Sequence, residues 1–137
     1  MNNNKITYIV FDTSILILAA ERPINLFEEV NRLIPGNNKF IVLSSVLDEL
    51  NRISLSSSIR ESKLAKVALK IASKCEVINV NYSKTADESL LNFAKNNKGC
   101  VAIATNDSTL KRKLRSIGIP TIYVRDFDHL DLEGEII

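Results

Sequence analysis

The stretch Cys100-Val101-Ala102-Ile103-Ala104-Thr105-Asn106-Asp107 decides the fold class of this 137-residue chain. It is a short apolar run that stops at a carboxylate and is followed by a helical pattern. A second run, Ile6–Phe11, stops in the same way at Asp12. Short apolar runs of this kind are typical of buried strands in a parallel sheet. Because sites in open α/β sheets form beyond the carboxyl ends of the strands, the two aspartates suggest a metal site there.

Strands and helices alternate along the rest of the chain. We expect strands at residues 7–11, 40–43, 76–80, 100–104 and 121–124. We expect helices at about residues 24–33, 45–55, 86–96 and 108–116, and one more after the serines at 56–58. This alternation predicts an α/β fold, with a central parallel sheet of about five strands and helices on both faces. The length fits one domain that spans residues 1–137.

Composition restricts the class of protein further. The chain is 45% hydrophobic and 25% charged, so it can form a core and is not disordered. No apolar run approaches the roughly 20 residues of a membrane span, and the first residues show no signal-peptide pattern. We therefore expect a cytoplasmic protein in which Cys75 and Cys100 are buried free thiols. Two cysteines and His129 do not suffice for a zinc centre of the usual kind.

The charge is unevenly distributed. Residues 1–124 carry 17 Lys and Arg against 11 Asp and Glu, whereas residues 125–137 carry one Arg against five acids. A basic body suits a polyanionic partner, and a solvated charged surface is the alternative.

Helical periodicity singles out two more carboxylates. In the helix expected at residues 86–96, Asp87 lies on the same face as Leu90 and Ala94, whereas Glu88 points away. An ionised carboxylate on an apolar face is costly unless it is paired or binds a metal. In the helix expected at residues 45–55, Glu49 falls at the edge of the core face and Asp48 faces solvent. Glu49 and Asp87 can therefore border a cleft.

Four carboxylates from four strand–helix units can thus meet at one edge of the sheet. The candidate metal ligands and catalytic residues are Asp12, Glu49, Asp87 and Asp107. Oxygen ligands without histidine or cysteine select Mg²⁺ or Mn²⁺. Each residue also has a simpler explanation: a helix N-cap for Asp12 and Asp107, a surface acid for Glu49, and a partner of the helix dipole for Asp87.

These residues carry a resemblance to a known family. The relevant segments are Asp12-Thr13-Ser14, Val46-Leu47-Asp48-Glu49-Leu50, Ala86-Asp87-Glu88-Ser89-Leu90-Leu91 and Thr105-Asn106-Asp107. In order and spacing they resemble a PIN domain over essentially the whole chain. The chain looks most like small archaeal single-domain PIN proteins, which are similar to VapC-type toxin ribonucleases and to the PIN nucleases of small-subunit rRNA processing.

The resemblance implies a three-layer α/β/α fold and Mg²⁺- or Mn²⁺-dependent endoribonuclease activity. It maps the acidic quartet of the family onto the four carboxylates above. Relatives often carry a further acid where this chain has Thr109, which puts a second metal site in question. The candidate auxiliary residues are Thr13, Ser14, Thr105 and Asp126. The resemblance also implies a homodimer, RNA as substrate, and an antitoxin protein or a ribosomal precursor particle as partner.

Basic residues lie close to the expected acidic edge. The candidate RNA-binding residues are Lys111, Arg112, Lys113 and Arg115, for which a solvated helix face is the alternative. We expect the acids after Val124 to leave the last strand at the metal edge and to compete with RNA for these cations. We expect the homodimer to use apolar residues such as Ile15, Leu16 and Leu18.

Two other function classes compete with the nuclease. One is a catalytically weak PIN fold that acts as an RNA-binding or ribosome-assembly module. The other is a receiver-like phosphoacceptor domain, which needs a pair of acids after the first strand and a lysine after the fifth. The sequence disfavours the second, because Phe11 precedes Asp12 and Arg125-Asp126 follows the fifth strand.

Overall fold

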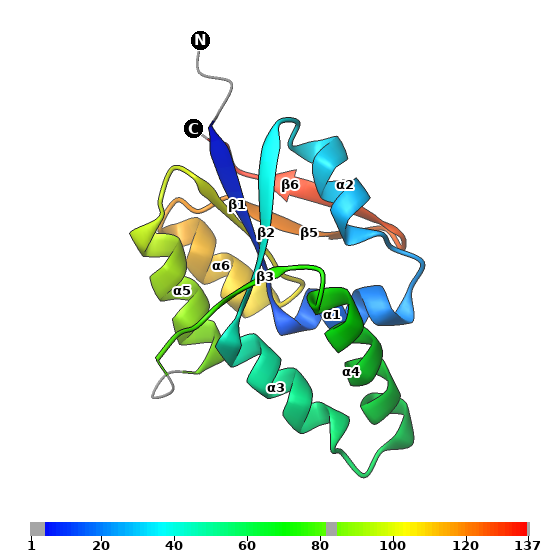
Figure 1. Ribbon diagram of the computed structural model, residues 1–137. Coiled ribbons are helices and arrows are strands. Elements are labelled where there is room, and N and C mark those ends of the chain that lie inside the picture. The colour runs from blue at the N-terminus through cyan, green and yellow to red at the C-terminus, as the bar shows by residue number, and fades with distance from the viewer. Residues whose placement is uncertain (1–4, 82–84, 137) are drawn as a thin grey trace.

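The computed structural model describes residues 5–81 and 85–136 and shows a mixed sheet with helices on both faces (Figure 1). The strands are β1 (Ile6–Phe11), β2 (Asn37–Leu43), β3 (Glu76–Ile78), β4 (Val101–Ala104), β5 (Thr121–Arg125) and β6 (His129–Glu133). The helices are α1 (Thr13–Glu21), α2 (Leu26–Leu33), α3 (Ser44–Ser54), α4 (Ile59–Ala72), α5 (Ala86–Asn96) and α6 (Ser108–Ser116). The strand order is β3-β2-β1-β4-β5-β6.

The first five strands are parallel, and their register brings their carboxyl ends to one edge of the sheet. Phe11 at the end of β1 lies opposite Ala104 at the end of β4. Leu43 at the end of β2 lies opposite Ile78 at the end of β3. The segments that begin α1, α3 and α6 therefore start from a common edge, as expected for a parallel α/β sheet.

The helices form a layer on each side of the sheet. Figure 1 shows α5 and α6 on one side of β1 and β2, with α1, α2 and α4 on the other. Both layers cover a core in which Phe11, Ile103 and Leu110 are fully buried. On the side of α2, the rings of Phe11 and Phe40 stack with centroids 5.9 Å apart, and Phe27 meets Phe40 edge-on at 4.9 Å. The α/β class predicted from the alternation is confirmed.

The C-terminal segment differs from expectation, because β6 pairs with β5 in the antiparallel direction. We expected residues after Val124 to form an acidic terminus at the metal edge. Instead the chain reverses at Asp126, whose φ of 58° is in the left-handed region. The strand then runs back along β5 and buries Leu130 completely. Acidic side chains at alternating positions obscured this pattern, although Leu130 and Leu132 supply the alternating apolar residues of a strand.

Helix α2 holds the outer edge of β6 through an ion pair. The Oε1 atom of Glu29 accepts a hydrogen bond from the backbone N–H of Leu130 at 2.8 Å. The Nη2 atom of Arg32 donates to the carbonyl oxygen of Leu130 at 2.8 Å and lies 3.0 Å from Glu29 Oε1. The hydrogen bonds from Arg32 and from Leu130 lower the pKa of the Glu29 carboxyl.

The buried face of α4 also differs from expectation. The apolar spacing predicts a core face with Leu64, Val67, Ala68 and Ile71, of which Ala68 is fully buried but Val67 is 43% exposed. The fully buried residues of α4 are Ala65, Ala68 and Ala72. The alanines have no bulky side chain, so they let α4 lie close to α1 and α3, its contact partners. The bulkier residues are thereby left at the borders of the contact.

Several other expectations concern exposed surface. Ile15 and Leu16, which we expected at a dimer interface, are fully buried in the core. The homodimer therefore stays a prediction without that support.

Cys75 and Cys100 are free and partly buried, and burial raises the pKa of the Cys75 thiol to about 12. No helix in the described part of the chain combines the length and the apolarity that a membrane crossing requires.

Candidate active site

Four carboxylates from four segments of the chain line one cleft at the carboxyl edge of the sheet. The cleft has a volume of about 480 Å³. Its lining residues are Asp12, Thr13, Ser14, Glu49, Thr85, Ala86, Asp87 and Asp107. We call Asp12, Glu49, Asp87 and Asp107 the cleft acids. They come from the end of β1, from α3, from the first turn of α5 and from the start of α6.

Asp12 is the most deeply placed cleft acid, at 4% exposure. Its Oδ1 atom accepts a hydrogen bond from the N–H of Thr13 at 2.7 Å. Its Oδ2 atom accepts from the hydroxyls of Thr105 at 2.7 Å and Ser14 at 2.9 Å. Asp12 is thus the N-cap of α1, as the simpler explanation proposed, and it also faces the cleft. The two explanations are compatible because the cap leaves the carboxylate at the sheet edge.

Thr105 and Ser14 connect the ends of β1 and β4. Thr105 is fully buried, and its hydroxyl oxygen accepts a hydrogen bond from the N–H of Asp107 at 3.1 Å. The Oγ atom of Ser14 accepts from the N–H of Asn106 at 2.9 Å. Two of the auxiliary candidates therefore fix the positions of Asp12 and of the segment that carries Asp107.

Asp107 is the N-cap of α6. Its Oδ1 atom accepts hydrogen bonds from the N–H groups of Thr109 at 2.9 Å and Leu110 at 3.2 Å. Thr109 contributes its backbone to this cap, and its side chain is exposed and is not among those that line the cleft. The position at which relatives often carry a further acid thus belongs to the start of α6.

Glu49 and Asp87 each have an acidic neighbour in the sequence, and helical geometry directs that neighbour away from the cleft. Glu49 is partly buried and lines the cleft, whereas Asp48 is exposed. Asp87 is likewise partly buried, whereas Glu88 is exposed. Both placements are as the helical periodicity predicted.

The sequence predicts that Ser44-Ser45 supplies the N-cap of the helix at residues 45–55, but α3 already begins at Ser44. The N-cap position is Leu43, which makes no side-chain capping bond. Ser44 begins the helix, and its Oγ atom accepts a hydrogen bond from the N–H of Val80 at 2.9 Å. This bond ties the start of α3 to the chain that follows β3.

The cleft acids interact electrostatically. Burial raises the pKa of the Asp87 carboxyl above its ordinary value. The negative charges of the other three cleft acids raise this pKa further, and the ammonium group of Lys113 opposes them. The cleft therefore concentrates negative charge that its own residues only partly neutralise, which favours a cation.

The lining side chains fit a hard cation. All of them except Ala86 end in oxygen, and the Oγ1 atom of Thr13 is buried without a hydrogen-bond partner among the described residues. In the same part of the chain, no three Asp, Glu, His or Cys side chains lie close enough together to ligate one ion directly. Oxygen donors of this kind fit Mg²⁺ or Mn²⁺, which commonly keep several water ligands.

The candidate RNA-binding residues of α6 differ in their exposure and in their contacts. Lys113 is exposed and interacts with Asp87 across the cleft, and Arg112 is exposed. The Nζ atom of Lys111 lies 4.1 Å from the centre of the Tyr123 ring. Arg115 donates a hydrogen bond to the carbonyl oxygen of Ile119 at 3.2 Å and pairs with Glu133 at 3.7 Å. Lys113 is thus the cation of this set with an electrostatic connection to the cleft.

One predicted site residue lies outside the cleft, and one residue that was not predicted for the site lines it. Asp126 lies in the turn between β5 and β6, 3.5 Å from His129, and is not among the residues that line the cleft. Thr85 lines the cleft and caps α5 by accepting a hydrogen bond from the N–H of Glu88 at 3.2 Å. The sequence predicted Thr85 as a cap, and its position two residues before Asp87 was the signal for a place in the site.

Comparisons with known proteins agree with this architecture. A family model described as "PIN like domain" matches residues 9–126. Ribonuclease VapC4 of Methanocaldococcus jannaschii is 33% identical over 129 residues, which cover 93% of this chain and 98% of that protein. Ribonuclease VapC9 of Archaeoglobus fulgidus is 32% identical over 124 residues, which cover 90% of this chain and 87% of that protein.

A solved structure shares the fold. The structure of the PIN domain endonuclease Utp24 superposes with a TM-score of 0.79 and covers 98% of this chain and 97% of its own. Its sequence is 23% identical, so this likeness concerns the fold alone.

Proposed function

Because the chain belongs to the PIN-like domain family, we propose that it is an endoribonuclease that hydrolyses RNA phosphodiester bonds with Mg²⁺ or Mn²⁺. The observation that carries the proposal is the electrostatic coupling of Asp87 to the other three cleft acids within one cleft. The two relatives at 32–33% identity, both named ribonucleases, support RNA as the substrate.

The cleft acids would hold the ion, and the hydroxyls around them would keep them in place. A bound Mg²⁺ or Mn²⁺ would supply Lewis acidity that activates water and offsets the charge of the phosphate. Asp12 is oriented for this role by Ser14 and Thr105. Burial and the other cleft acids raise the pKa of Asp87 in the metal-free cleft, and a bound cation would offset the repulsion among these acids. If water attacks the phosphorus in line with the 3′ oxygen, the P–O3′ bond would break and leave 5′-phosphate and 3′-hydroxyl ends.

Lys113 would serve the substrate rather than the ion. Its ammonium group already interacts with the charge of Asp87. When a phosphodiester enters the cleft, Lys113 can pair with a non-bridging phosphate oxygen without reading the base. Arg112 is exposed one residue earlier on α6 and can add a second phosphate contact.

A metal-titrated cleavage assay with matched variants tests the proposal. Glu49→Gln and Asp87→Asn should each lower the cleavage rate by about a hundredfold or more, the scale seen when a group that stabilises the transition state is removed. The adjacent variants Asp48→Asn and Glu88→Gln carry the same change of charge on exposed positions and should retain activity. Chelator should abolish cleavage, and Mg²⁺ or Mn²⁺ should restore it. Equal losses in the paired variants would contradict the site.

A catalytically weak RNA-binding module is the second candidate function. The observation in its favour is that no three potential ligands among the described residues lie close enough to hold an ion directly. In that case RNA would bind in chelator, and purified protein would show no cleavage at any Mg²⁺ or Mn²⁺ concentration. The same titration therefore separates the two candidates.

The biological partner follows from the same assignment. The two ribonucleases of the VapC series favour a toxin-type role, with an antitoxin protein as partner, over ribosomal RNA processing. Purification of the protein from its native cells should then recover a small protein partner in stoichiometric amount. Recovery with a ribosomal precursor particle would instead favour the processing role.

A further inference from the structure

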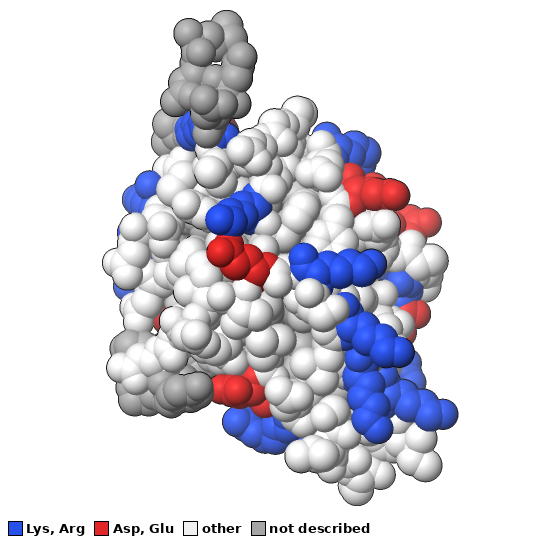
Figure 2. Space-filling view, viewed as in Figure 1, with Lys and Arg blue, Asp and Glu red and all other residues white. Residues whose placement is uncertain are grey.

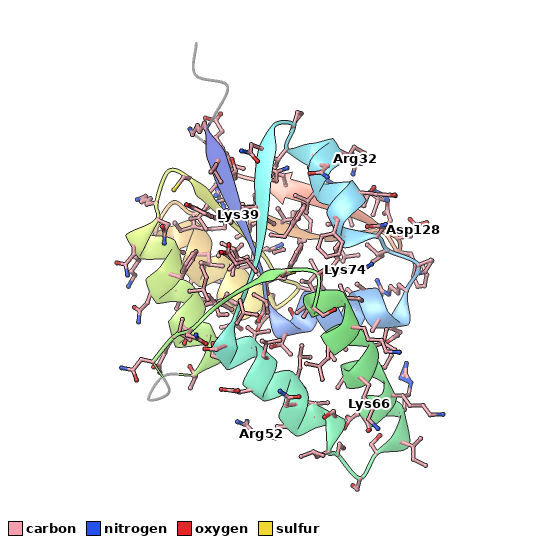
Figure 3. All side chains as sticks on the ribbon, in the orientation of Figure 1. Arg32, Lys39, Arg52, Lys66, Lys74 and Asp128 are labelled. Carbon is pink, nitrogen blue, oxygen red and sulfur yellow. The ribbon has the colours of Figure 1, made fainter. Side chains whose placement is uncertain are left out.

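Helix α4 carries a row of exposed cations that takes no part in the cleft. We call Arg60, Lys63, Lys66 and Lys70, together with Lys74 just past the end of the helix, the α4 basic stripe. All five side chains are exposed, and none lines the cleft. Figure 2 shows Lys and Arg gathered over α4 on the right of the molecule. Figure 3 places Lys66 beside the lower part of this helix and Lys74 near its upper end.

The spacing of the stripe places its charges on one side of the helix. The four members within α4 are three or four residues apart, so they fall within an arc of about 120°. They extend for about 15 Å at the rise of an α-helix. The single acid of α4, Glu61, lies away from this arc and accepts a hydrogen bond from the hydroxyl of Ser56 at 3.2 Å.

Most of these charges are not neutralised within the described residues. Arg60 pairs with Glu21 at 3.3 Å. Lys63, Lys66 and Lys70 form no ion pair with any described residue. Lys74 lies 5.9 Å from the centre of the Phe27 ring. A row of cations with so few counter-charges gains free energy when a polyanion displaces its small counterions.

The opposite face of α4 restricts what can bind to the stripe. Ala65, Ala68 and Ala72 are buried against neighbouring helices, so the exposed large apolar side chains of α4 are Ile59 and Val67 alone, too few to insert into a bilayer. The surface that remains is a charged row on a rigid helix. Lysine ammonium groups act as point charges toward phosphate and do not select a base.

We infer that the α4 basic stripe is a second RNA-binding surface, which holds the substrate outside the cleft through its phosphates. This inference rests on the proposed function for the identity of the polyanion. Helix α4 contacts α1 and α3, the helices that contribute Ser14 and Glu49 to the cleft. An RNA strand that extends from the cleft past α1 or α3 can therefore reach the stripe.

Binding in chelator tests the stripe without any need for cleavage. The stripe variant combines Lys66→Gln with Lys70→Gln, and the control combines Lys95→Gln with Lys98→Gln. All four lysines are exposed, and each double variant loses two positive charges. Glutamine retains high helix propensity, so both variants should fold. Fluorescence anisotropy would follow a single-stranded RNA of about 30 nucleotides over a range of salt concentrations.

The stripe variant should bind this RNA about tenfold more weakly at low salt, with a salt slope smaller by about 1.4, because two phosphate contacts are lost. The control should remain within about twofold of the unmodified protein. Equal losses in both variants, or no loss in either, would overturn the inference. Loss of binding to phosphatidylserine vesicles with RNA affinity unchanged would overturn it too, in favour of a membrane surface.

Cleavage of a short RNA separates this inference from the proposed function. An RNA of about six nucleotides offers far fewer phosphates to a second surface than one of about 30 nucleotides. The stripe variant should cleave it at the unmodified rate while its KM for the longer RNA rises. Absence of cleavage in the unmodified protein would refute the proposed function, whereas the anisotropy comparison would still decide on the stripe.

Discussion

The chain contains two acidic regions. In one the carboxylates repel one another, and in the other they lie beside basic side chains. The cleft acids face one another from four segments, and Lys113 opposes their repulsion of Asp87. In the C-terminal hairpin, two acids lie beside an arginine and two lie beside His129. Asp131 accepts a hydrogen bond from Arg125 at 2.6 Å, and Glu133 lies 3.7 Å from Arg115. Asp126 and Asp128 lie 3.5 Å and 3.4 Å from His129.

The pKa shifts express this difference directly. The pKa of the Asp87 carboxyl is raised, by burial first and then by the other cleft acids. The pKa of the Asp131 carboxyl is lowered, by the hydrogen bond from Arg125 first and then by the N–H of Leu132. Acid content alone therefore does not identify a functional site. Carboxylates that the fold keeps together with little counter-charge mark a candidate site, because the fold tolerates their repulsion.

The largest expected contrast is in cleavage. Asp12→Asn should lower the rate by about a hundredfold or more, since it removes a charge from the proposed metal site. Asp131→Asn removes a charge of the same sign and should leave the rate within about twofold. Initial rates on one RNA at saturating Mn²⁺ would measure both. Comparable rates for the two variants would remove the functional distinction between the regions.

Metal binding should stabilise the protein through the cleft acids alone. At an ion concentration about a hundred times its Kd, the free energy of unfolding should rise by about 2.7 kcal/mol. This gain should be much smaller in Glu49→Gln and unchanged in Glu133→Gln. Thermal melts with Mn²⁺ and with chelator would show the effect, and a full gain in Glu49→Gln would place the ion elsewhere.

Without metal, the two regions should respond oppositely to neutralisation. Asp87→Asn should raise the free energy of unfolding by up to about 1 kcal/mol after screening by solvent, because it removes a repelled charge. Asp131→Asn should lower the melting temperature, because it removes an attracted one. Melts in chelator test both directions, and a lower melting temperature for Asp87→Asn would make Asp87 a structural cap of α5.

The smallest contrast is in the pH dependence of stability. In the folded state Asp87 keeps its proton to higher pH than the ordinary aspartate value of 3.8. In chelator its contribution to stability therefore falls as the pH rises from 3.8 through the raised pKa. Asp131 has the opposite sign, and its contribution is lost as the pH falls from 3.8 through the lowered pKa. The difference in melting temperature between Asp87→Asn and the unmodified protein should thus increase as the pH rises. The corresponding difference for Asp131→Asn should vanish in acid.

The parts of the fold that local signals determine were predicted closely. Helices α5 and α6 have the bounds expected from the sequence, because Thr85 and Asp107 cap their starts. The faces of Glu49 and Asp87 followed from helical periodicity alone. The hydrogen bond between Thr105 and Asp12 joins residues 93 positions apart. Such a contact depends on the pairing of β1 with β4, which no local pattern reveals.

Two errors arose where tertiary contacts outweighed the apolar pattern. In α4 the alanines form the contact face, so the predicted face is right at Ala68 and wrong at Val67, which lies outside the contact. Strand β6 was missed because its acids suggested a solvated terminus. Its backbone pairs with β5 and its Leu130 fills the core, and both gains depend on the complete sheet.

The contact between α2 and Leu130 has a consequence for how copies of the chain behave in concentrated solution. An outer strand normally offers free N–H and C=O groups to another chain, which is a route to aggregation. Here Glu29 and Arg32 already occupy both backbone groups of Leu130. The strand at the other edge, β3, is only three residues long, so it offers little to pair with. Neither edge is therefore a good template for intermolecular β-pairing, and loss of the Glu29 carboxylate would open the longer one.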